Sequence, residues 1–189
     1  MTNCEQTFMN VDFQGLVDVN PHQCSLKEYE YIGRLVNECS PGNVLVFGAG
    51  NDSPYWIKIN HGGQTWFFEN DRRWIRKARK INPEILIEKV KYTTRRREWK
   101  KIIDNPQKLT VKLPNVAYQL NWDVIFIDAP RGNKNSKPGR MQSVYSASKL
   151  KYKHILLHDC DREVEREYFL KYIGKPDHAF DRLYHKEVH

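Results

Sequence analysis

Residues 43–52 read Asn-Val-Leu-Val-Phe-Gly-Ala-Gly-Asn-Asp, and they decide how the rest of the chain is interpreted. The apolar run at 44–47 is rich in β-branched and aromatic side chains, which is typical of a buried strand in a parallel sheet. Gly-Ala-Gly at 48–50 predicts a sharp turn where a ligand can approach bare backbone. Asp-Ser-Pro at 52–54 then predicts a helix start, with a capping residue before a proline. A strand, a glycine turn and a helix start, in this order, favour a site for a nucleoside cofactor.

An acidic residue at the end of the next predicted strand strengthens this interpretation. Residues 64–68 read Gln-Thr-Trp-Phe-Phe, and Glu69 follows them. It lies about 20 residues after the glycines, the spacing at which a carboxylate binds ribose hydroxyls. The full dinucleotide pattern needs a third glycine, and Ser53 stands in its place. Because Asn51 and Asp52 would also meet a pyrophosphate, we expect a cofactor without phosphate, such as S-adenosylmethionine, rather than NAD. A purely structural glycine turn is the alternative.

The chain has 189 residues and a formal net charge of +8, which limits the classes of protein it fits. Its length predicts one domain at 25–189, preceded by an arm at 1–24 that packs over the cofactor site. We find no apolar run of transmembrane length and no signal peptide. The scattered cysteines predict reduced thiols in a cytoplasmic protein, without a metal finger. The basic balance favours an anionic partner, and a solvated basic surface without a specific partner is the alternative.

Predicted strands and helices alternate along the chain, which is the pattern of a parallel α/β sheet. The further predicted strands cover 85–92, 122–128 and 154–157, and the helices cover 26–36, 54–59, 72–81, 94–103, 141–150 and 162–173. We also expect a short strand at 109–113 and a strand or hairpin at 178–188. In such sheets ligands lie beyond the carboxyl ends of the strands, where Glu69, Asp128 and Asp159 stand. Three carboxylates at strand ends are more than helix capping needs.

Five motifs in fixed order carry a resemblance to a known family. They are VFGAGNDSPYW at 46–56, NHGG at 60–63 with FFEND at 67–71, WDVIFIDAPRG at 122–132, KPGRM at 137–141 and HDCDREVE at 158–165. From about residue 24 onward, the chain resembles the glucuronoxylan 4-O-methyltransferases of plant cell-wall synthesis, which methylate glucuronic acid side chains of xylan. The resemblance implies a Rossmann-like S-adenosylmethionine-dependent methyltransferase fold. It also implies a mostly parallel sheet with helices on both faces, and S-adenosylmethionine as methyl donor.

The resemblance further implies roles for residues at matching positions. Gly48 and Gly50 would line the methionine part of the cofactor. Glu69 would bind the ribose, and Asn70 and Asp71 would lie near the adenine. The implied cofactor site also takes in Asn51, Asp52, Ser53 and Asp128. The positions that match family motifs facing the reaction centre are Asp128, Arg131, Gly139, Arg140, His158 and Asp159.

Methyl transfer to a sugar hydroxyl requires an aligned acceptor and help in removing its proton. In one route Asp128, Asp159 or His158 acts as the general base. In the other, Asp128 and Asp159 hold a divalent cation that lowers the pKa of the hydroxyl. The sequence leaves both routes open. Arg131 and Arg140 are candidates for bidentate binding of a uronate carboxylate, and a loop ion pair or helix cap is the other interpretation of Arg140.

The chain departs from the plant pattern in three ways that leave the acceptor open. It shows no membrane anchor, the region before 122–128 is shorter and more basic, and the loop at 131–134 is more charged. We predict methylation of the 4-OH of glucuronic acid, in a glycan or a smaller acceptor. The alternatives are a small-molecule or RNA methyltransferase, with basic clusters such as 95–97 on the RNA, and a non-catalytic scaffold domain in polysaccharide synthesis. We expect neither nucleic acid nor a membrane as partner.

Overall fold

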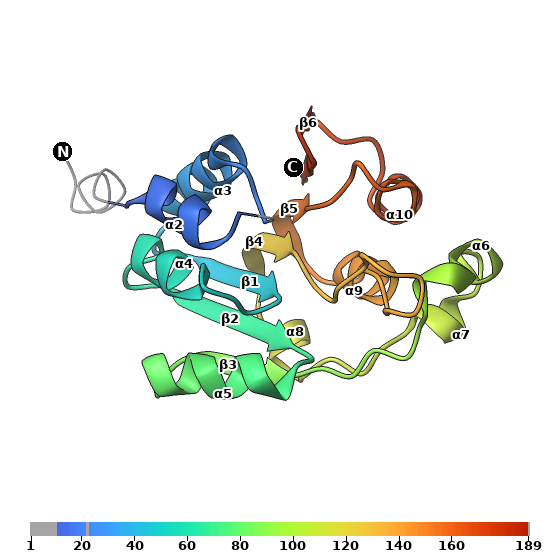
Figure 1. Cartoon of the computed structure of the whole chain (residues 1–189), viewed down its shortest axis with the longest axis horizontal. Coiled ribbons are helices and arrows are strands. Elements are labelled where there is room, and N and C mark those ends of the chain that lie inside the picture. The colour runs from blue at the N-terminus through green and yellow to red at the C-terminus, as the bar shows by residue number, and fades with distance from the viewer. Residues whose placement is uncertain (1–10, 22, 189) are drawn as a thin grey trace.

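The computed structural model describes residues 11–21 and 23–188, which are built around one seven-stranded sheet (Figure 1). The strands are β1 (Asn43–Phe47), β2 (Gln64–Glu69), β3 (Leu86–Lys89), β4 (Trp122–Ile127), β5 (Tyr152–Leu157), β6 (His178–Phe180) and β7 (Leu183–Glu187). Their order is β3-β2-β1-β4-β5-β7-β6. The first five are parallel, and β7 runs antiparallel to both β5 and β6. The chain moves outward from β1 in both directions, so a ligand crevice is expected beyond β1 and β4.

Helices cover both faces of this sheet. They are α2 (Phe13–Val19), α3 (Leu26–Glu38), α4 (Ser53–Ile59), α5 (Arg72–Ile81), α6 (Trp99–Ile102), α7 (Pro106–Leu109), α8 (Val116–Gln119), α9 (Met141–Ala147) and α10 (Glu163–Tyr172), with the 3-10 turn η1 (Arg96–Glu98). This arrangement confirms the Rossmann-like methyltransferase fold that the resemblance implied. No helix within residues 11–21 and 23–188 is both long enough and apolar enough to cross a membrane.

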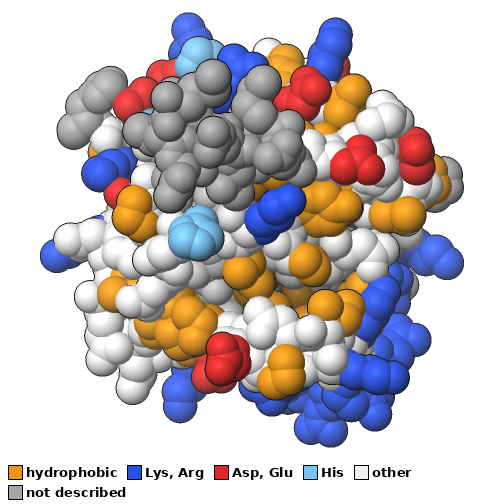
Figure 2. Space-filling view, turned by 90° about the vertical axis from the view of Figure 1, so that its left-hand side faces the viewer, with side chains coloured by type: hydrophobic (Ala, Val, Ile, Leu, Met, Phe, Trp, Pro, Cys, Tyr) orange, Lys and Arg blue, Asp and Glu red, His pale blue; other side chains and the backbone are white. Residues whose placement is uncertain are grey.

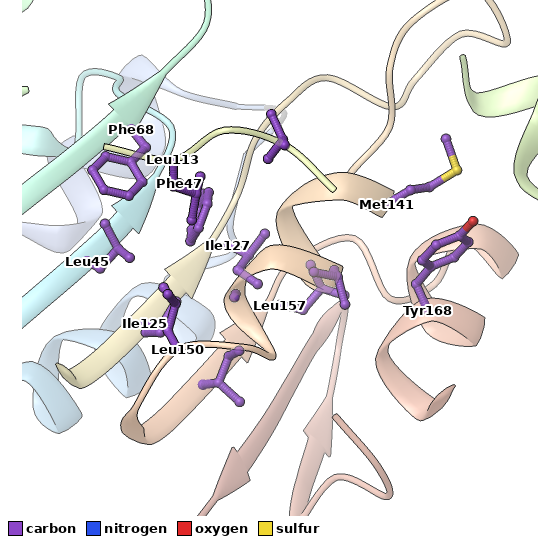
Figure 3. Close-up of a cluster of buried hydrophobic side chains, with 14 of the residues drawn as sticks. Leu45, Phe47, Phe68, Leu113, Ile125, Ile127, Met141, Leu150, Leu157 and Tyr168 are labelled. Carbon is purple, nitrogen blue, oxygen red and sulfur yellow. The ribbon is translucent and has the colours of Figure 1, made fainter. Parts of the chain in front are cut away.

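Alternating side chains of the central strands build two separate cores. Val44 and Val46 of β1 join a cluster with residues of α2, α3, α4 and α5. Leu45 and Phe47 point to the opposite face and pack with α7 to α10, as Figure 3 shows for Met141 and other members of that cluster. Because successive side chains of a strand point to opposite faces, a continuous apolar run is needed to fill both cores.

The region between β3 and β4 differs most from prediction. The helix predicted at 94–103 is wrong at its start, which is irregular before η1 and α6. The strand predicted at 109–113 does not form, although its apolar residues Leu109, Val111 and Leu113 are buried. Gln142 Nε2 donates to the carbonyls of Lys108 (3.1 Å) and Thr110 (3.4 Å), which satisfies that backbone without a neighbouring strand.

The start of the chain also differs from prediction. Residues 1–10 lie outside the described part, but 13–19 form α2 within the predicted arm, where no helix was predicted. Asp12 caps this helix, because its Oδ1 accepts a hydrogen bond from Gly15 N at 2.8 Å. The short segment after α2 places Asn20 against the turn after β1, where Asn20 Oδ1 accepts from Asn51 Nδ2 at 3.0 Å.

A buried histidine at the antiparallel edge makes the fold sensitive to acid. His185 is 3% exposed, with Nδ1 2.7 Å from Tyr31 Oη and Nε2 3.2 Å from His154 Nδ1. Burial, together with His154 and His178, lowers the pKa of His185 from 6.5 to about 4. Between these values the unfolded chain binds a proton that the folded chain does not, so stability falls as pH falls from about 6.5 towards about 4.

We therefore predict that His185→Gln flattens this part of the stability profile, because glutamine can hydrogen-bond to Tyr31 and His154 without titrating. Between about pH 7 and about pH 5, the unmodified protein should lose about 2 kcal/mol more unfolding free energy than the variant. Urea unfolding at both pH values measures this difference. Equal losses in the two proteins would contradict the prediction.

Candidate active site

A cavity of about 250 Å³ opens beyond the carboxyl ends of β1, β2 and β4. Every residue predicted to bind the cofactor lines it except Ser53. Those that do are Gly48, Gly50, Asn51, Asp52, Glu69, Asn70, Asp71 and Asp128. Asn20 and Gln23, from the segment before α3, line the same cavity. The turn after β1, the residues after β2 and those after β4 therefore form one site.

The turn after β1 needs a glycine at position 48 and leaves little room for a side chain at position 50. Gly48 has φ +119°, a conformation that residues with a side chain rarely adopt, and a Cβ there would lie 3.0 Å from the Cβ of Ala129. A Cβ at Gly50 would lie 2.7 Å from Asp52 Oδ1. Ser53 Oγ accepts from Gly50 N at 3.0 Å, so Ser53 supports the turn from behind rather than lining the cavity.

Glu69 accepts hydrogen bonds from the backbone on two sides of the cavity. Its Oε2 accepts from Ala49 N at 2.8 Å, and its Oε1 accepts from Asp71 N at 2.6 Å. The side chain is 4% exposed, and burial raises its pKa, partly offset by these backbone hydrogen bonds. Its predicted contact with a ribose stays a prediction. The structure adds a second role, which is to join the turn after β1 to the start of α5.

Asp52 supplies another carboxylate to the cavity. It occupies the position before α4, but its side chain makes no capping hydrogen bond, so that predicted role is wrong. Its Oδ2 instead accepts from Trp56 Nε1 at 3.0 Å. Burial and the nearby Asp128 raise the pKa of Asp52 to about 6. It is thus mostly ionised at neutral pH, where it opposes a pyrophosphate and favours a cationic ligand.

Arg140 lies buried between the two carboxylates at the ends of β4 and β5. Its Nη2 is 2.6 Å from Asp128 Oδ1, and its Nη1 is 2.5 Å from Asp159 Oδ2. The same nitrogens also donate to the main-chain carbonyls of Asp128 and His158. Arg140 is 4% exposed. Both terminal nitrogens already have partners, and its predicted contact with an acceptor uronate stays a prediction.

This arrangement also bears on the predicted metal. Asp128, His158 and Asp159 place one ligand atom each within 4.8 Å of one another, the spacing of a possible metal site. The guanidinium of Arg140 already supplies positive charge between Asp128 and Asp159, and an adjacent cation would be repelled by it. As they are arranged, these residues fit an arginine better than a divalent ion.

Asp159 faces away from the cavity. It has φ +65° and is 4% exposed. Besides Arg140, its carboxylate lies 2.7 Å from Arg162 Nη1 and 3.5 Å from Arg182 Nη1. Asp159 does not line the cavity. Because Asp159 does not line the cavity and three guanidinium groups already hold its carboxylate, the geometry favours a supporting role for it.

His158 carries positive charge and is buried behind Asp128. Its Nδ1 lies 3.0 Å from Asp128 Oδ1, and its Nε2 lies 3.4 Å from Glu28 Oε2. Burial opposes the charge, but Cys24, Asp128 and Glu28 raise the pKa of His158 to about 12. Burial raises the pKa of the Cys24 thiol to about 12, so at neutral pH the carboxylates hold this charge. A protonated imidazole at 1% exposure is poorly suited to act as the general base.

Glu28 is a residue of this network that sequence reasoning missed. It is fully buried in α3, where Oε2 accepts from Ser25 N at 2.7 Å and Oε1 accepts from Arg182 N at 2.8 Å. The sequence signal at Glu28 was that of a capping box with Ser25, which the structure contains. Nothing in that local signal indicates a contact with His158, because the two residues are far apart in the chain.

Asp128 is the one predicted catalytic side chain that reaches the cavity among the residues the structure describes. Its side chain is 19% exposed, and its Oδ1 accepts from both Arg140 and His158. Burial by itself would raise the pKa of Asp128, but Arg140 and His158 outweigh it and the pKa is lowered. Arg131, three residues on, is exposed at the edge of the cavity and forms no ion pair within the described chain.

Comparison with known proteins now identifies the family. The family model described as IRX15/IRX15L/GXM matches residues 27–110 and 105–178. The chain belongs to this family. It is 32% identical over 179 residues to glucuronoxylan 4-O-methyltransferase 2 of Arabidopsis thaliana, a match that covers 82% of this chain and 61% of that protein. The resemblance inferred from the five motifs is therefore confirmed.

Two other Arabidopsis thaliana relatives show how varied the named members are. Protein IRX15-LIKE is 33% identical over 173 residues, covering 77% of this chain and 55% of its own length. Arabinogalactan O-methyltransferase 1 is 29% identical over 196 residues, covering 89% and 68%. The chain thus spans about 61% of the length of glucuronoxylan 4-O-methyltransferase 2 and 55% of that of Protein IRX15-LIKE. Among solved structures, Thermoplasma acidophilum 1320 aligns with a TM-score of 0.47 and 11% identity, covering 90% of this chain and 81% of that one.

The Arg140 bridge leads to a prediction about stability. Arg140→Met would leave the carboxylates of Asp128 and Asp159 buried without their shared cation, so the unfolding free energy should fall by about 3–5 kcal/mol. Arg140→Lys keeps a charge but not the two-sided geometry, and should recover part of this loss. Urea unfolding measures both variants. A loss below about 1 kcal/mol in Arg140→Met, the range of a surface ion pair, would refute the bridging role.

Proposed function

We propose that the chain is an S-adenosylmethionine-dependent O-methyltransferase acting on a sugar hydroxyl, with the 4-OH of glucuronic acid in a glycan or smaller acceptor as its target. The observation that carries this proposal is the position of Asp128, whose carboxylate faces the cavity while Arg140 and His158 hold it from behind. Family membership supports it, since relatives are named as O-methyltransferases of glucuronoxylan and of arabinogalactan.

The carboxylates that line the cavity support the choice of cofactor. Asp52, Glu69 and Asp128 line it together, and they favour the sulfonium and ammonium groups of S-adenosylmethionine over a pyrophosphate. Gly48 and Gly50 leave room for the methionine part to approach the backbone. When bound, the cofactor supplies an activated methyl group, and the protein supplies alignment and a route for the proton.

In the proposed mechanism Asp128 accepts the proton of the acceptor hydroxyl. Arg140 and His158 both contact its Oδ1, which leaves Oδ2 for the acceptor. They also lower its pKa, so the carboxylate is ionised at neutral pH and is free to accept the proton as the oxygen–methyl bond forms. Arg131, exposed at the edge of the cavity, is placed to bind the acceptor carboxylate.

The direct test is methyl transfer from labelled S-adenosylmethionine to xylo-oligosaccharides capped with glucuronic acid. We predict that Asp128→Asn lowers turnover by roughly 10²–10⁴-fold, the usual share of a general base, with the fold and cofactor affinity retained. Asp123→Asn, at the opposite end of β4, is the matched control and should leave turnover unchanged. Near-normal turnover of Asp128→Asn would exclude Asp128 as the base.

The same assay with a chelator tests the route of deprotonation. Since Arg140 takes the position between Asp128 and Asp159, we expect transfer to survive EDTA. Loss of transfer that a divalent cation restores would favour the metal route instead.

A second prediction concerns the cofactor alone. Glu69→Gln removes one of two carboxylate acceptors, so an amide N–H would face the backbone N–H of Ala49 or Asp71. We expect the dissociation constant for S-adenosylmethionine to rise at least about tenfold, the cost of losing one charged hydrogen bond. Calorimetric titration measures it, with circular dichroism to confirm the fold. Unchanged affinity would remove Glu69 from the cofactor site.

A scaffold role in polysaccharide synthesis is the second candidate. It is favoured by one finding, namely that Protein IRX15-LIKE is as similar to this chain as the named methyltransferases and its name gives no reaction. The cofactor titration separates the two functions. No binding of S-adenosylmethionine would support the scaffold, whereas binding without transfer would keep the enzyme and change the acceptor.

A further inference from the structure

Two basic segments from distant parts of the chain, residues 94–101 and 131–138, meet beside the cavity. Arg96 N donates to Lys137 O at 2.7 Å, and Arg97 N donates to Asn135 O at 3.2 Å. Thr94 Oγ1 adds a hydrogen bond to Pro138 O at 3.1 Å. We call the cations of the two joined segments the basic rim, which consists of Arg95, Arg96, Arg97, Lys100, Lys101, Arg131, Lys134 and Lys137.

The charge of the basic rim is largely uncompensated. Within the described chain, Lys100 is its one member in an ion pair, with Glu163 at 3.4 Å, where both side chains are exposed. Every other member except Arg96 is exposed, and Arg96 Nε is buried without a hydrogen-bond partner in the described structure. Glu98 is the one acidic residue in the two segments. Like charges held together in this way repel one another. Binding of an anion relieves this repulsion and therefore lowers the free energy.

The basic rim begins at the active site and continues away from it. Arg131 and Lys137 line the cavity into which Asp128 points. Beyond them, the cations around η1 border two hollows of about 310 and 580 Å³. The first is lined by Arg96, Arg97, Trp99, Asn135, Glu163 and Val164, and the second includes Arg95, Glu98 and Lys101. A chain with one sugar at Asp128 that leaves the cavity past Arg131 and Lys137 would cross this surface.

We propose that the basic rim binds the carboxylates of an acidic polysaccharide, so that the preferred acceptor is a polymer bearing several uronates rather than one small uronide. The inference rests on the proposed function and names the substrate class of the same site. Arg95, Arg96, Arg97 and Arg131 supply guanidinium groups for bidentate contacts with carboxylates. Contacts several sugars away from the reacting hydroxyl add affinity for long chains only, through multivalent attachment.

The rim fits a polysaccharide better than RNA. Binding of single-stranded RNA relies on exposed aromatic rings that stack with bases. Trp99 is the one aromatic residue in the two segments, and it is partly buried against the core, with Lys100 Nζ 5.0 Å from its ring centre. The rim therefore offers charge without a stacking platform.

A second group of cations provides a matched control. The exposed side of α5 carries Arg72, Arg73, Arg76, Lys77, Arg79 and Lys80. Figure 2 shows Lys and Arg side chains gathered on part of one face of the molecule. Arg76 and Lys80 of this set do not line the cavity. In the rim, Arg97 and Lys134 are exposed and likewise do not line it. Reversing two charges in either place changes the net charge equally.

The test compares Arg97→Glu/Lys134→Glu with Arg76→Glu/Lys80→Glu on two acceptors, a polymeric glucuronoxylan and a short xylo-oligosaccharide with one glucuronate. We expect the rim variant to raise KM for the polymer roughly tenfold and to weaken its salt dependence. The kcat/KM for the short acceptor should stay within about twofold. The α5 variant should leave both acceptors unchanged.

Other outcomes would overturn the inference. An unchanged KM for the polymer in the rim variant would exclude the rim. An equal loss on the short acceptor would mean that the substitutions disturb the active site. A loss on the polymer in the α5 variant alone would move the binding surface to α5.

If the unmodified protein methylates neither acceptor, the proposed function fails, and binding of polyglucuronate and of RNA at equal salt tests the rim separately. Polyglucuronate binding that the rim variant loses would support the rim despite that failure. Tighter binding of RNA than of polyglucuronate would exclude the acidic polysaccharide as partner.

Discussion

The whole site depends on the guanidinium of Arg140, which lies between the carboxylates of Asp128 and Asp159. Its nitrogens also bind the main-chain carbonyls of Asp128 and His158, so one side chain joins the ends of β4 and β5. A charge at 4% exposure is tolerable only because two carboxylates lie in direct contact with it. The bridge thus sets the position of Asp128 and makes a shared metal ion unnecessary for neutralising the two carboxylates.

Beside this bridge, side chains of alternating charge lie one behind another, from the cavity towards the interior. Asp128 faces the cavity, His158 lies behind it, and Glu28 lies behind His158. Because Glu28 also accepts from Arg182 N, this line of charges ties α3 and the turn between β6 and β7 to the proposed reaction centre. The turn after β1 has a separate support in Glu69, which accepts hydrogen bonds from Ala49 N and Asp71 N. Asp128 and Glu69 both line the cavity, so the two supports border the same site.

The sequence predicted the positions of the residues around the glycine turn better than the contacts at the ends of β4 and β5, for a physical reason. Gly48, Gly50 and Glu69 are read from local patterns, since a turn after a buried strand and an acid at the end of the next strand place them directly. The roles of Asp128, His158 and Asp159 depend on which of them Arg140 and Glu28 contact. Those contacts join residues that are 12 to 130 positions apart, and no local pattern reports them. The same limit applies to the region 94–113, where hydrogen bonds from distant residues replace the predicted helix start and strand.

By itself, the sequence determined the parallel α/β sheet, the glycine turn, the acids at the strand ends and the family, because strand and helix periodicity and short motifs are local properties of the chain. The tertiary structure alone decided which of the predicted catalytic groups reaches the cavity. Asp128 lines the cavity, whereas Asp159 and His158 are buried in ion pairs and do not line it. The tertiary structure also decided that Arg95–Arg97 and the loop after β4 form one basic surface, because main-chain hydrogen bonds join residues of the two segments that are about 40 positions apart.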